Sequence, residues 1–139
     1  MTFALEDGTG RVIGAAIEVH RTLGPGFLER IYENALSVEL SRRGISCVRQ
    51  VEVPIRYRDV EVGTHVLDLL VEDQIVVELK AVRRLEDIHF VIVRSYLKAL
   101  GREHALLLNF AAPTLEIRRV SSRDGPDGCR VPGFLGSRV

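Results

Sequence analysis

The sequence predicts an α/β domain, because stretches with helical periodicity and stretches with strand periodicity follow one another along it. The helical patterns cover residues 10–23, 28–43 and 84–100. The strand patterns cover residues 47–57, 61–71, 75–80 and 104–110 and, more weakly, 115–120. The expected order is therefore two helices, three strands, a third helix and one or two further strands.

The bulk composition fits one domain, since 139 residues with 46% hydrophobic content can build a single buried core. We expect this domain to cover residues 1–120, followed by a flexible tail over residues 121–139, where glycine and proline are frequent. The formal net charge of zero argues against a strongly basic, non-specific nucleic-acid binder but leaves room for a local basic patch.

Targeting, membrane and redox signals are missing from the sequence. No apolar run reaches the length of a membrane span, and the N-terminus carries acids instead of the basic region of a signal peptide, so we expect a cytoplasmic protein. Cys47 and Cys129 lie far apart and form no CxxC motif. The four histidines are scattered and show no metal-ligand spacing.

Glycines set the ends of the first two helices. Gly24-Pro25-Gly26 breaks the first, and Gly44 supplies the left-handed stop of the second. Glu29 lies in the first turn of the second helix, a position where the helix dipole favours acids in any case. Tyr32 follows on the apolar stripe of the same helix and is expected to be a core aromatic residue.

The first two strands differ in their patterns. Residues 47–57 alternate between apolar and polar side chains, and Pro54 favours a sheet edge. Residues 61–71 are apolar on both faces, which predicts a central strand. Regular alternation would place Leu67, Leu69 and Val71 on one face and Val66, Asp68 and Leu70 on the other.

Three charged residues, Asp68, Glu78 and Lys80, interrupt the apolar second and third strands. Desolvating a charge is costly unless a metal or an opposite charge compensates for it. The short turn at residues 72–74 predicts an antiparallel hairpin in which Asp68 and Glu78 are cross-strand neighbours. Because opposed carboxylates repel each other, a bound divalent cation is expected between them. The alternative is a structural ion pair between Lys80 and one acid.

The third helix carries Arg94, Lys98 and, just beyond its end, Arg102 at four-residue spacing. We expect this basic stripe to contact phosphate, and a solvated charged face is the alternative. Tyr96, on the apolar side of the helix, is expected to be a core aromatic residue, with a place at the rim of the acidic site as the alternative.

Asp68 followed by Glu78-Leu79-Lys80 on consecutive strands, with a helix before and a helix and strand after, resembles the PD-(D/E)XK nuclease superfamily. Gly26-Phe27-Leu28-Glu29-Arg30-Ile31-Tyr32 is similar to the GxxExxY signature of a bacterial family within that superfamily. The resemblance covers about residues 10–120. It implies a restriction-endonuclease-like αβββαβ core, with a mixed central sheet flanked by helices.

The resemblance also implies roles for individual residues. Asp68 and Glu78 match the two metal-binding acids, Lys80 matches the catalytic lysine, and Glu29 matches a helix acid that completes the metal site in some relatives. Tyr96 matches the tyrosine of a Gln-xxx-Tyr motif that contacts substrate. Ile92 stands at the glutamine position of that motif, and Phe90 stands where relatives often have a polar residue.

We therefore expect a nuclease that uses Mg or Mn to hydrolyse phosphodiester bonds of nucleic acid, DNA rather than RNA. The metal would polarise the phosphoryl oxygen and activate water, and Lys80 would orient that water and offset charge in the transition state. The alternative is a catalytically inactive module with the nuclease fold, used for binding or assembly, to which Ile92, Phe90 and the neutral charge point. A homodimer through the edge strand near Pro54 is a third interpretation.

Overall fold

The computed structural model describes residues 5–122. Its elements, in chain order, are α1 (Leu5–Leu23), α2 (Glu29–Arg42), β1 (Cys47–Tyr57), β2 (Val60–Val71), β3 (Ile75–Lys80), α3 (Asp87–Leu100), β4 (His104–Asn109) and β5 (Glu116–Ser121). This is the order that the sequence predicts, and the weak last strand is present. The tail predicted for residues 121–139 lies outside the described residues from position 123 onward.

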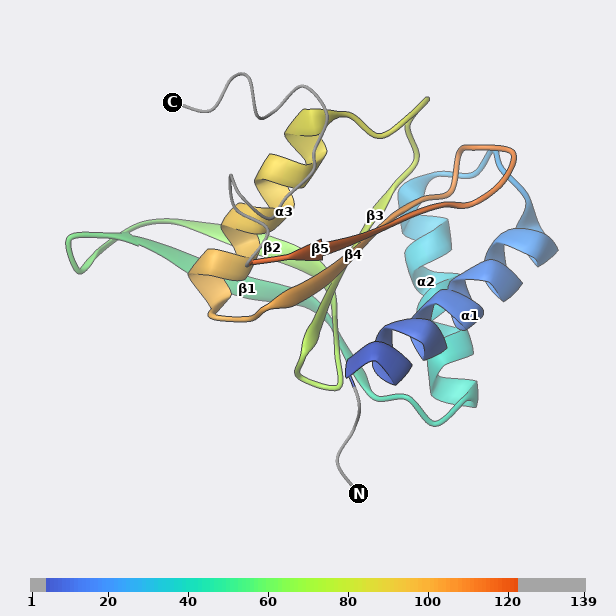
Figure 1. Ribbon diagram of the computed structural model, residues 1–139, viewed down its shortest axis with the longest axis horizontal. Helices are drawn as coiled ribbons and strands as arrows, with labels where there is room; N and C mark the ends of the chain where they lie inside the picture. The colour runs from blue at the N-terminus through green and yellow to red at the C-terminus, as the bar shows by residue number, and fades with distance from the viewer. Residues whose placement is uncertain (1–4, 123–139) are drawn as a thin grey trace.

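The strands form one five-stranded mixed sheet in the order β1-β2-β3-β4-β5 (Figure 1). β3 and β4 are parallel, and the other neighbouring strands are antiparallel. The parallel pair requires a long crossover, and α3 supplies it. β1 is an edge strand, as Pro54 predicts.

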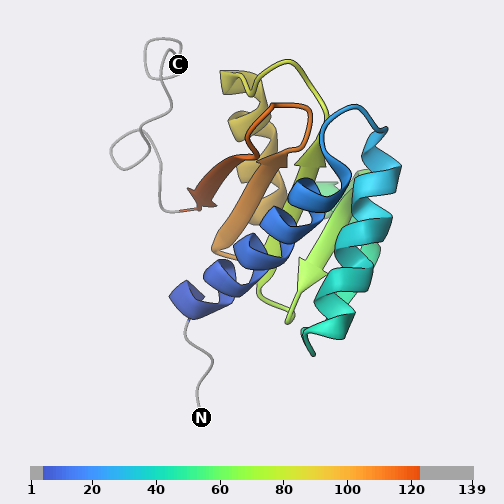
Figure 2. The same cartoon turned by 90° about the vertical axis from the view of Figure 1, so that its right-hand side faces the viewer.

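Helices cover both faces of the sheet. α1 and α2 lie on one face and α3 on the other (Figure 2). Each face has its own buried cluster. The α1/α2 cluster includes Val12, Ala16, Tyr32, Leu36, Leu69, Val77, Leu79, Leu108 and Phe110. The α3 cluster includes Val53, Leu67, Leu70, Val76, Val93, Leu97, Ala105 and Leu107. These layers confirm the predicted α/β fold with a mixed sheet flanked by helices.

The first residues of α1 and α3 differ from the sequence prediction. α1 begins at Leu5, five residues earlier than the periodicity indicates, and it continues through Gly8 and Gly10. Packing outweighs the low helix propensity of glycine here, because Val12, Ala15 and Ala16 of the same helix are fully buried. α3 begins only at Asp87, where Glu86 and His89 form a capping box. No described helix has the length and apolar character needed to cross a membrane.

The faces of β2 exchange at Asp68, contrary to the regular alternation that the sequence predicts. Leu67 packs in the α3 cluster, whereas Leu69 packs in the α1/α2 cluster. The paired strand is irregular at the same level, since Gln50 has a positive φ of 53° and the strand register passes from Arg49↔Leu69 to Val51↔Leu67 without a pair between them. The prediction was wrong because it assumed an unbroken pleat.

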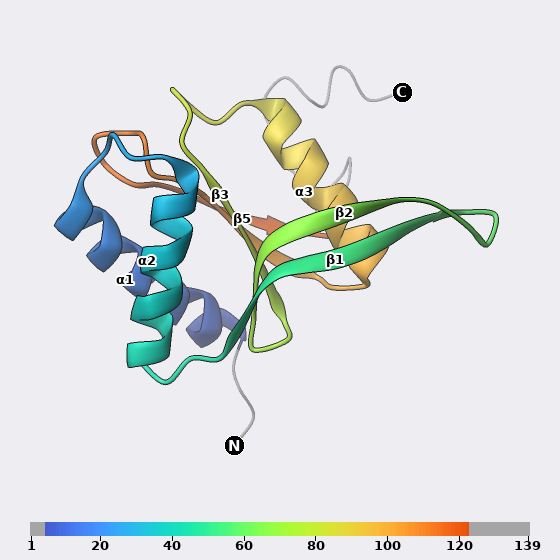
Figure 3. The same ribbon diagram turned by 180° about the vertical axis from the view of Figure 1, so that it is seen from behind.

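Beyond this bend, β1 and β2 leave the rest of the sheet together. We call residues 51–67 the arm; it extends alongside α3 (Figure 3). Its tip is a two-residue turn at Arg58 and Asp59, both with positive φ. The prediction of β2 as a central strand therefore holds only for its buried second half, because residues 60–66 are exposed.

Candidate active site

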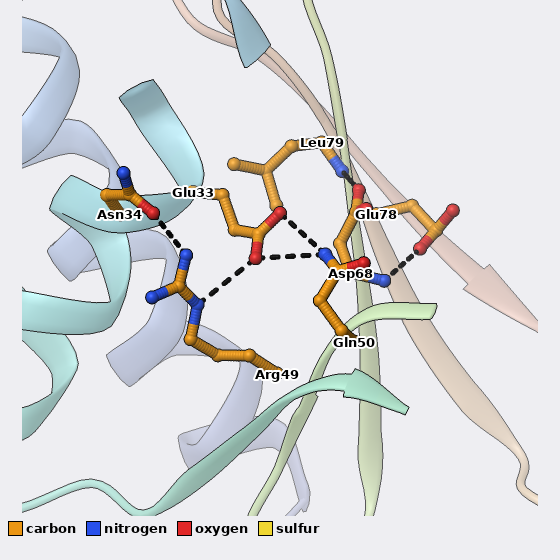
Figure 4. Close-up of polar contacts among 7 residues, drawn as sticks. All are labelled: Glu33, Asn34, Arg49, Gln50, Asp68, Glu78 and Leu79. Carbon is orange, nitrogen blue, oxygen red and sulfur yellow. Dashed lines mark hydrogen bonds and ion pairs between the residues drawn. The ribbon is translucent and has the colours of Figure 1, made fainter. Parts of the chain in front are cut away.

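Asp68 and Glu78 lie opposite each other where β2 and β3 separate. The regular pairing of the two strands ends at Leu69↔Val77, one residue before them. Beyond that point each carboxylate accepts a backbone hydrogen bond from the other strand (Figure 4). The Asp68 N–H donates to Glu78 Oε1, and the Leu79 N–H donates to Asp68 Oδ2, both at 2.9 Å. The cross-strand neighbours predicted from the short turn are thus brought together.

Burial dominates the electrostatics of this pair. Glu78 is 5% exposed, and burial, followed by the charge of Asp68, raises its pKa from 4.5 to about 8. Burial likewise raises the pKa of Asp68 from 3.8 to about 6, and the nearby charges of Glu33 and Glu29 add to the rise. The backbone N–H bonds oppose both shifts. Without a cation, the pair therefore retains a proton near neutral pH.

Lys80 is a basic side chain whose charge acts on both acids. It follows Glu78 by two residues on β3, is partly buried, and lowers the pKa of Asp68 and of Glu78. Within residues 5–122, however, Lys80 forms no ion pair within 4 Å with either carboxylate. The alternative interpretation, a structural ion pair between Lys80 and one of the two acids, therefore does not hold among the described residues.

Glu29 begins α2 and is exposed to solvent. Its charge raises the pKa of both Asp68 and Glu78, so it lies on the site's side of the helix. In the part of the chain that the structure describes, no three His, Cys, Asp or Glu side chains converge as a metal-ligand group. The role of Glu29 as a third metal ligand stays a prediction, and the closely placed acids are Asp68 and Glu78.

Glu33 is an acid near the site that the sequence reasoning missed (Figure 4). It is only 4% exposed, and its carboxylate accepts two hydrogen bonds from Gln50 Nε2, at 2.9 and 3.0 Å, and one from Arg49 Nε at 3.1 Å. These contacts hold the left-handed Gln50 opposite the bend at Asp68. The four-residue spacing from Glu29, which places both acids on one helix face, is the signal that could have revealed it.

The residues predicted to bind substrate all lie on α3 but have different surroundings. Tyr96 packs its ring against His65 at 4.6 Å between centroids, and burial, followed by the charges of Glu78 and Asp68, raises its pKa. Tyr96 also packs against the α3 cluster, which agrees with the prediction of a core aromatic residue, and the charges of the acid pair act on it. Lys98 is exposed beside the arm, and Arg94 is partly buried.

Arg102 does not extend the predicted basic stripe. Its guanidinium donates to a side-chain oxygen of Asp73 at 2.9 Å and to the Asp73 carbonyl at 3.0 Å. These bonds tie the end of α3 to the β2–β3 turn, at the opposite end of β3 from Lys80. The prediction failed for this residue because helical spacing carries no information about a partner 29 residues away.

The comparison that decides the family is a match of the chain to a family model described as the PD-(D/E)XK nuclease superfamily, which spans residues 6–120. The chain belongs to the PD-(D/E)XK nuclease superfamily. No curated protein and no solved structure matches it. The restriction-endonuclease-like fold predicted for this chain is thereby confirmed.

Within the nuclease domain, Glu78-Leu79-Lys80 has the (D/E)XK spacing that gives the superfamily its name. Leu67 precedes Asp68 where that name has proline, and the leucine is fully buried in the α3 cluster. The backbone N–H of Leu79, the X residue, is the donor to Asp68. The tripeptide therefore places both an acid and a fixed hydrogen-bond donor at the point where the strands separate.

Tyr32 of the GxxExxY segment fixes the loop that leads into α2 of the nuclease domain. It is fully buried and stacks on Phe110 at 4.6 Å between ring centroids. Its hydroxyl donates to the Gly24 carbonyl at 2.5 Å and accepts the Phe27 N–H at 3.1 Å. The prediction of a core aromatic residue is confirmed, and the bonds of Tyr32 set the position at which Glu29 begins the helix.

Proposed function

We propose that this protein is a divalent-metal-dependent nuclease that hydrolyses phosphodiester bonds of DNA. The observation that carries the proposal is the pair of carboxylates of the half-buried Asp68 and the buried Glu78, each fixed by a backbone N–H of the other's strand, with Lys80 two residues beyond Glu78. Membership of the PD-(D/E)XK nuclease superfamily supports nucleic acid as the substrate class. The choice of DNA over RNA stays a prediction.

The donor set suits Mg or Mn. Asp68 and Glu78 each use one oxygen for the cross-strand bond, and the other oxygen of each carboxylate accepts no hydrogen bond from the described residues. Magnesium typically takes one or two carboxylates together with water and substrate oxygens. A divalent charge would also relieve the repulsion that raises the pKa of both acids. When bound, such an ion supplies Lewis-acid polarisation of the phosphate and a more acidic water.

The chain's own residues have separate tasks in this proposal. Asp68 and Glu78, once ionised, hold the cation at the point where β2 and β3 separate. Lys80, which has no ion-pair partner among residues 5–122, is available to orient the attacking water and to balance charge on the phosphate in the transition state. Glu29 is proposed as a further ligand reached through the exposed start of α2.

We also propose that the chain belongs to the GxxExxY group within the superfamily. Gly26, Glu29 and Tyr32 support this, since Tyr32 fixes the loop and Glu29 starts the helix that faces the acids. A homodimer through the exposed β1 edge stays a prediction. The cytoplasmic location also stays a prediction.

Cleavage by purified protein tests the nuclease proposal. Single- and double-stranded DNA and RNA should be incubated with Mg or Mn, and with EDTA as the blank. We expect metal-dependent cleavage of DNA that Lys80→Ala abolishes without unfolding the protein. Arg42→Ala, a loss of one exposed cation at the far end of α2, is the control and should cut like wild type. Equal cleavage by wild type and Lys80→Ala would show that the activity belongs to another site or a contaminant.

The second candidate function is a non-catalytic binding or assembly module with the nuclease fold. It is favoured by the finding that no three acidic, histidine or cysteine side chains converge among the described residues, and by Ile92 at the family glutamine position. This candidate predicts binding of nucleic acid without metal-dependent cleavage. Calorimetry with Mg and Mn separates the two, because the module gives no heat of metal binding and the nuclease gives heat that Glu78→Gln removes.

A further inference from the structure

A groove of about 580 Å³ lies between α3 and the arm, outside the acid pair. Pro54, Ile55 and Arg56 of β1 and His65 of β2 form one side, and Ser95, Lys98 and Ala99 of α3 form the other. This volume is within the range of sites that hold a small ligand or a segment of a polymer. Figure 3 shows that the arm runs beside α3, and the groove lies against the second half of that helix.

We propose that this groove is a nucleic-acid binding subsite, which holds the strand next to the phosphodiester that reacts. The proposal rests on the proposed nuclease function and adds a second contact region to it. Its occupant is a single nucleic-acid strand, whose phosphates contact Arg56 and Lys98 and whose sugar or base edges rest on Pro54, Ile55 and Ala99.

The charges of the groove fit this occupant. Its lining contains two permanent cations and a histidine and no acidic residue. Within residues 5–122, neither Arg56 nor Lys98 forms an ion pair, and both are exposed. Glu61 lies opposite Arg56 in the strand register, but its carboxylate accepts a hydrogen bond from Thr64 Oγ1 instead. Two uncompensated cations beside an apolar floor match a chain of phosphates, sugars and bases.

The groove is connected to the acid pair through two aromatic rings. His65, a lining residue of the groove, contacts the ring of Tyr96 at 4.6 Å between centroids. Tyr96 in turn lies close enough to Glu78 and Asp68 for their charges to raise its pKa. A strand whose phosphate sits at the acids therefore reaches the groove by passing over these rings, without crossing the buried core.

Binding of a labelled oligonucleotide tests the subsite. The probe is a fluorescent single-stranded oligodeoxynucleotide of about 16 nucleotides, with EDTA present so that nothing is cleaved. Arg56→Ala/Lys98→Ala removes the two groove cations. Arg21→Ala/Arg42→Ala removes two exposed cations from α1 and α2 and is the matched control. Circular dichroism and urea unfolding check that each double variant keeps its fold.

Losing two phosphate contacts should lower the slope of log affinity against log salt by about 1.4 for a single strand. Between about 50 mM and about 200 mM salt, wild type should then lose about sevenfold more affinity than the groove variant. The control variant should keep the wild-type slope. KM for cleavage of the oligonucleotide should rise in the groove variant and stay at the wild-type value in the control variant.

The subsite is overturned if the groove variant binds the oligonucleotide with wild-type affinity and slope, or if both double variants weaken binding equally. The assignment to nucleic acid would be overturned if polyglutamate displaced the labelled oligonucleotide as effectively as unlabelled oligonucleotide does. Failure of the nuclease proposal would look different. In that case the wild type would still bind the oligonucleotide through the groove but would cut nothing with Mg or Mn.

Discussion

Glu78→Gln should remove much of the pH dependence that the acid pair of Asp68 and Glu78 imposes on the stability of the metal-free protein. The pKa of Glu78 in the folded protein is about 8, against an ordinary value of 4.5, so the folded state holds this proton more tightly than the unfolded state does. The stability contributed by this group is therefore fully present below pH 4.5 and is lost as the pH rises through about 8. Glutamine stays neutral and can still accept the Asp68 N–H through its amide oxygen.

The magnitude follows from the two pKa values. Between about pH 5.5 and about pH 8.5, ionisation of Glu78 should cost the folded wild-type protein about 3 kcal/mol of unfolding free energy. The side chain is almost completely buried, so solvent screening reduces this figure little. The advantage of Glu78→Gln over wild type should accordingly grow by about 3 kcal/mol across that pH interval.

Urea unfolding in EDTA, followed by circular dichroism at both pH values, measures this difference. Glu52→Gln neutralises an exposed acid on β1 and is the control for the loss of one carboxylate. A constant difference between Glu78→Gln and wild type at the two pH values would refute the reasoning, because it would mean that Glu78 ionises normally in the folded protein.

Two further predictions concern the residues that position the site. Tyr32→Phe should lower the unfolding free energy by about 1–3 kcal/mol, because the Gly24 carbonyl and the Phe27 N–H both lose their partner; an unfolding curve that coincides with wild type would show that these bonds contribute nothing. Glu33→Ala should cost about 2 kcal/mol through the loss of charge-assisted hydrogen bonds, measured in the same assay, and a variant as stable as wild type would contradict this.

Much of the fold could be predicted because local patterns specify it. The limits of β1 and β3 follow from alternation and flanking turns, and the facing of Asp68 and Glu78 follows from the length of one turn. The start of α1 could not be predicted in this way, since Gly8 and Gly10 oppose a helix locally and only packing against the sheet compensates for them.

The surroundings of the acid pair depend on contacts that sequence periodicity does not encode. Gln50 has no residue-type preference for the left-handed conformation that it adopts, and Glu33, which bonds to it, would ordinarily be expected at a solvated helix surface. The exchange of faces between Leu67 and Leu69 follows from this irregularity and from the separation of β2 from β3. Sequence reasoning identified the charged residues but not the bend on which they lie.

The bend at Asp68 and the two-residue tip at Arg58 and Asp59 lie at opposite ends of the arm. Residues added in equal number to both strands at the tip would lengthen the arm and leave every residue nearer the bend with its present partner and face. The span of a bound strand and the chemistry at the acids are therefore encoded in separate parts of the chain. Sequence drift at the tip can alter how much substrate is contacted while the geometry around Asp68 and Glu78 stays fixed.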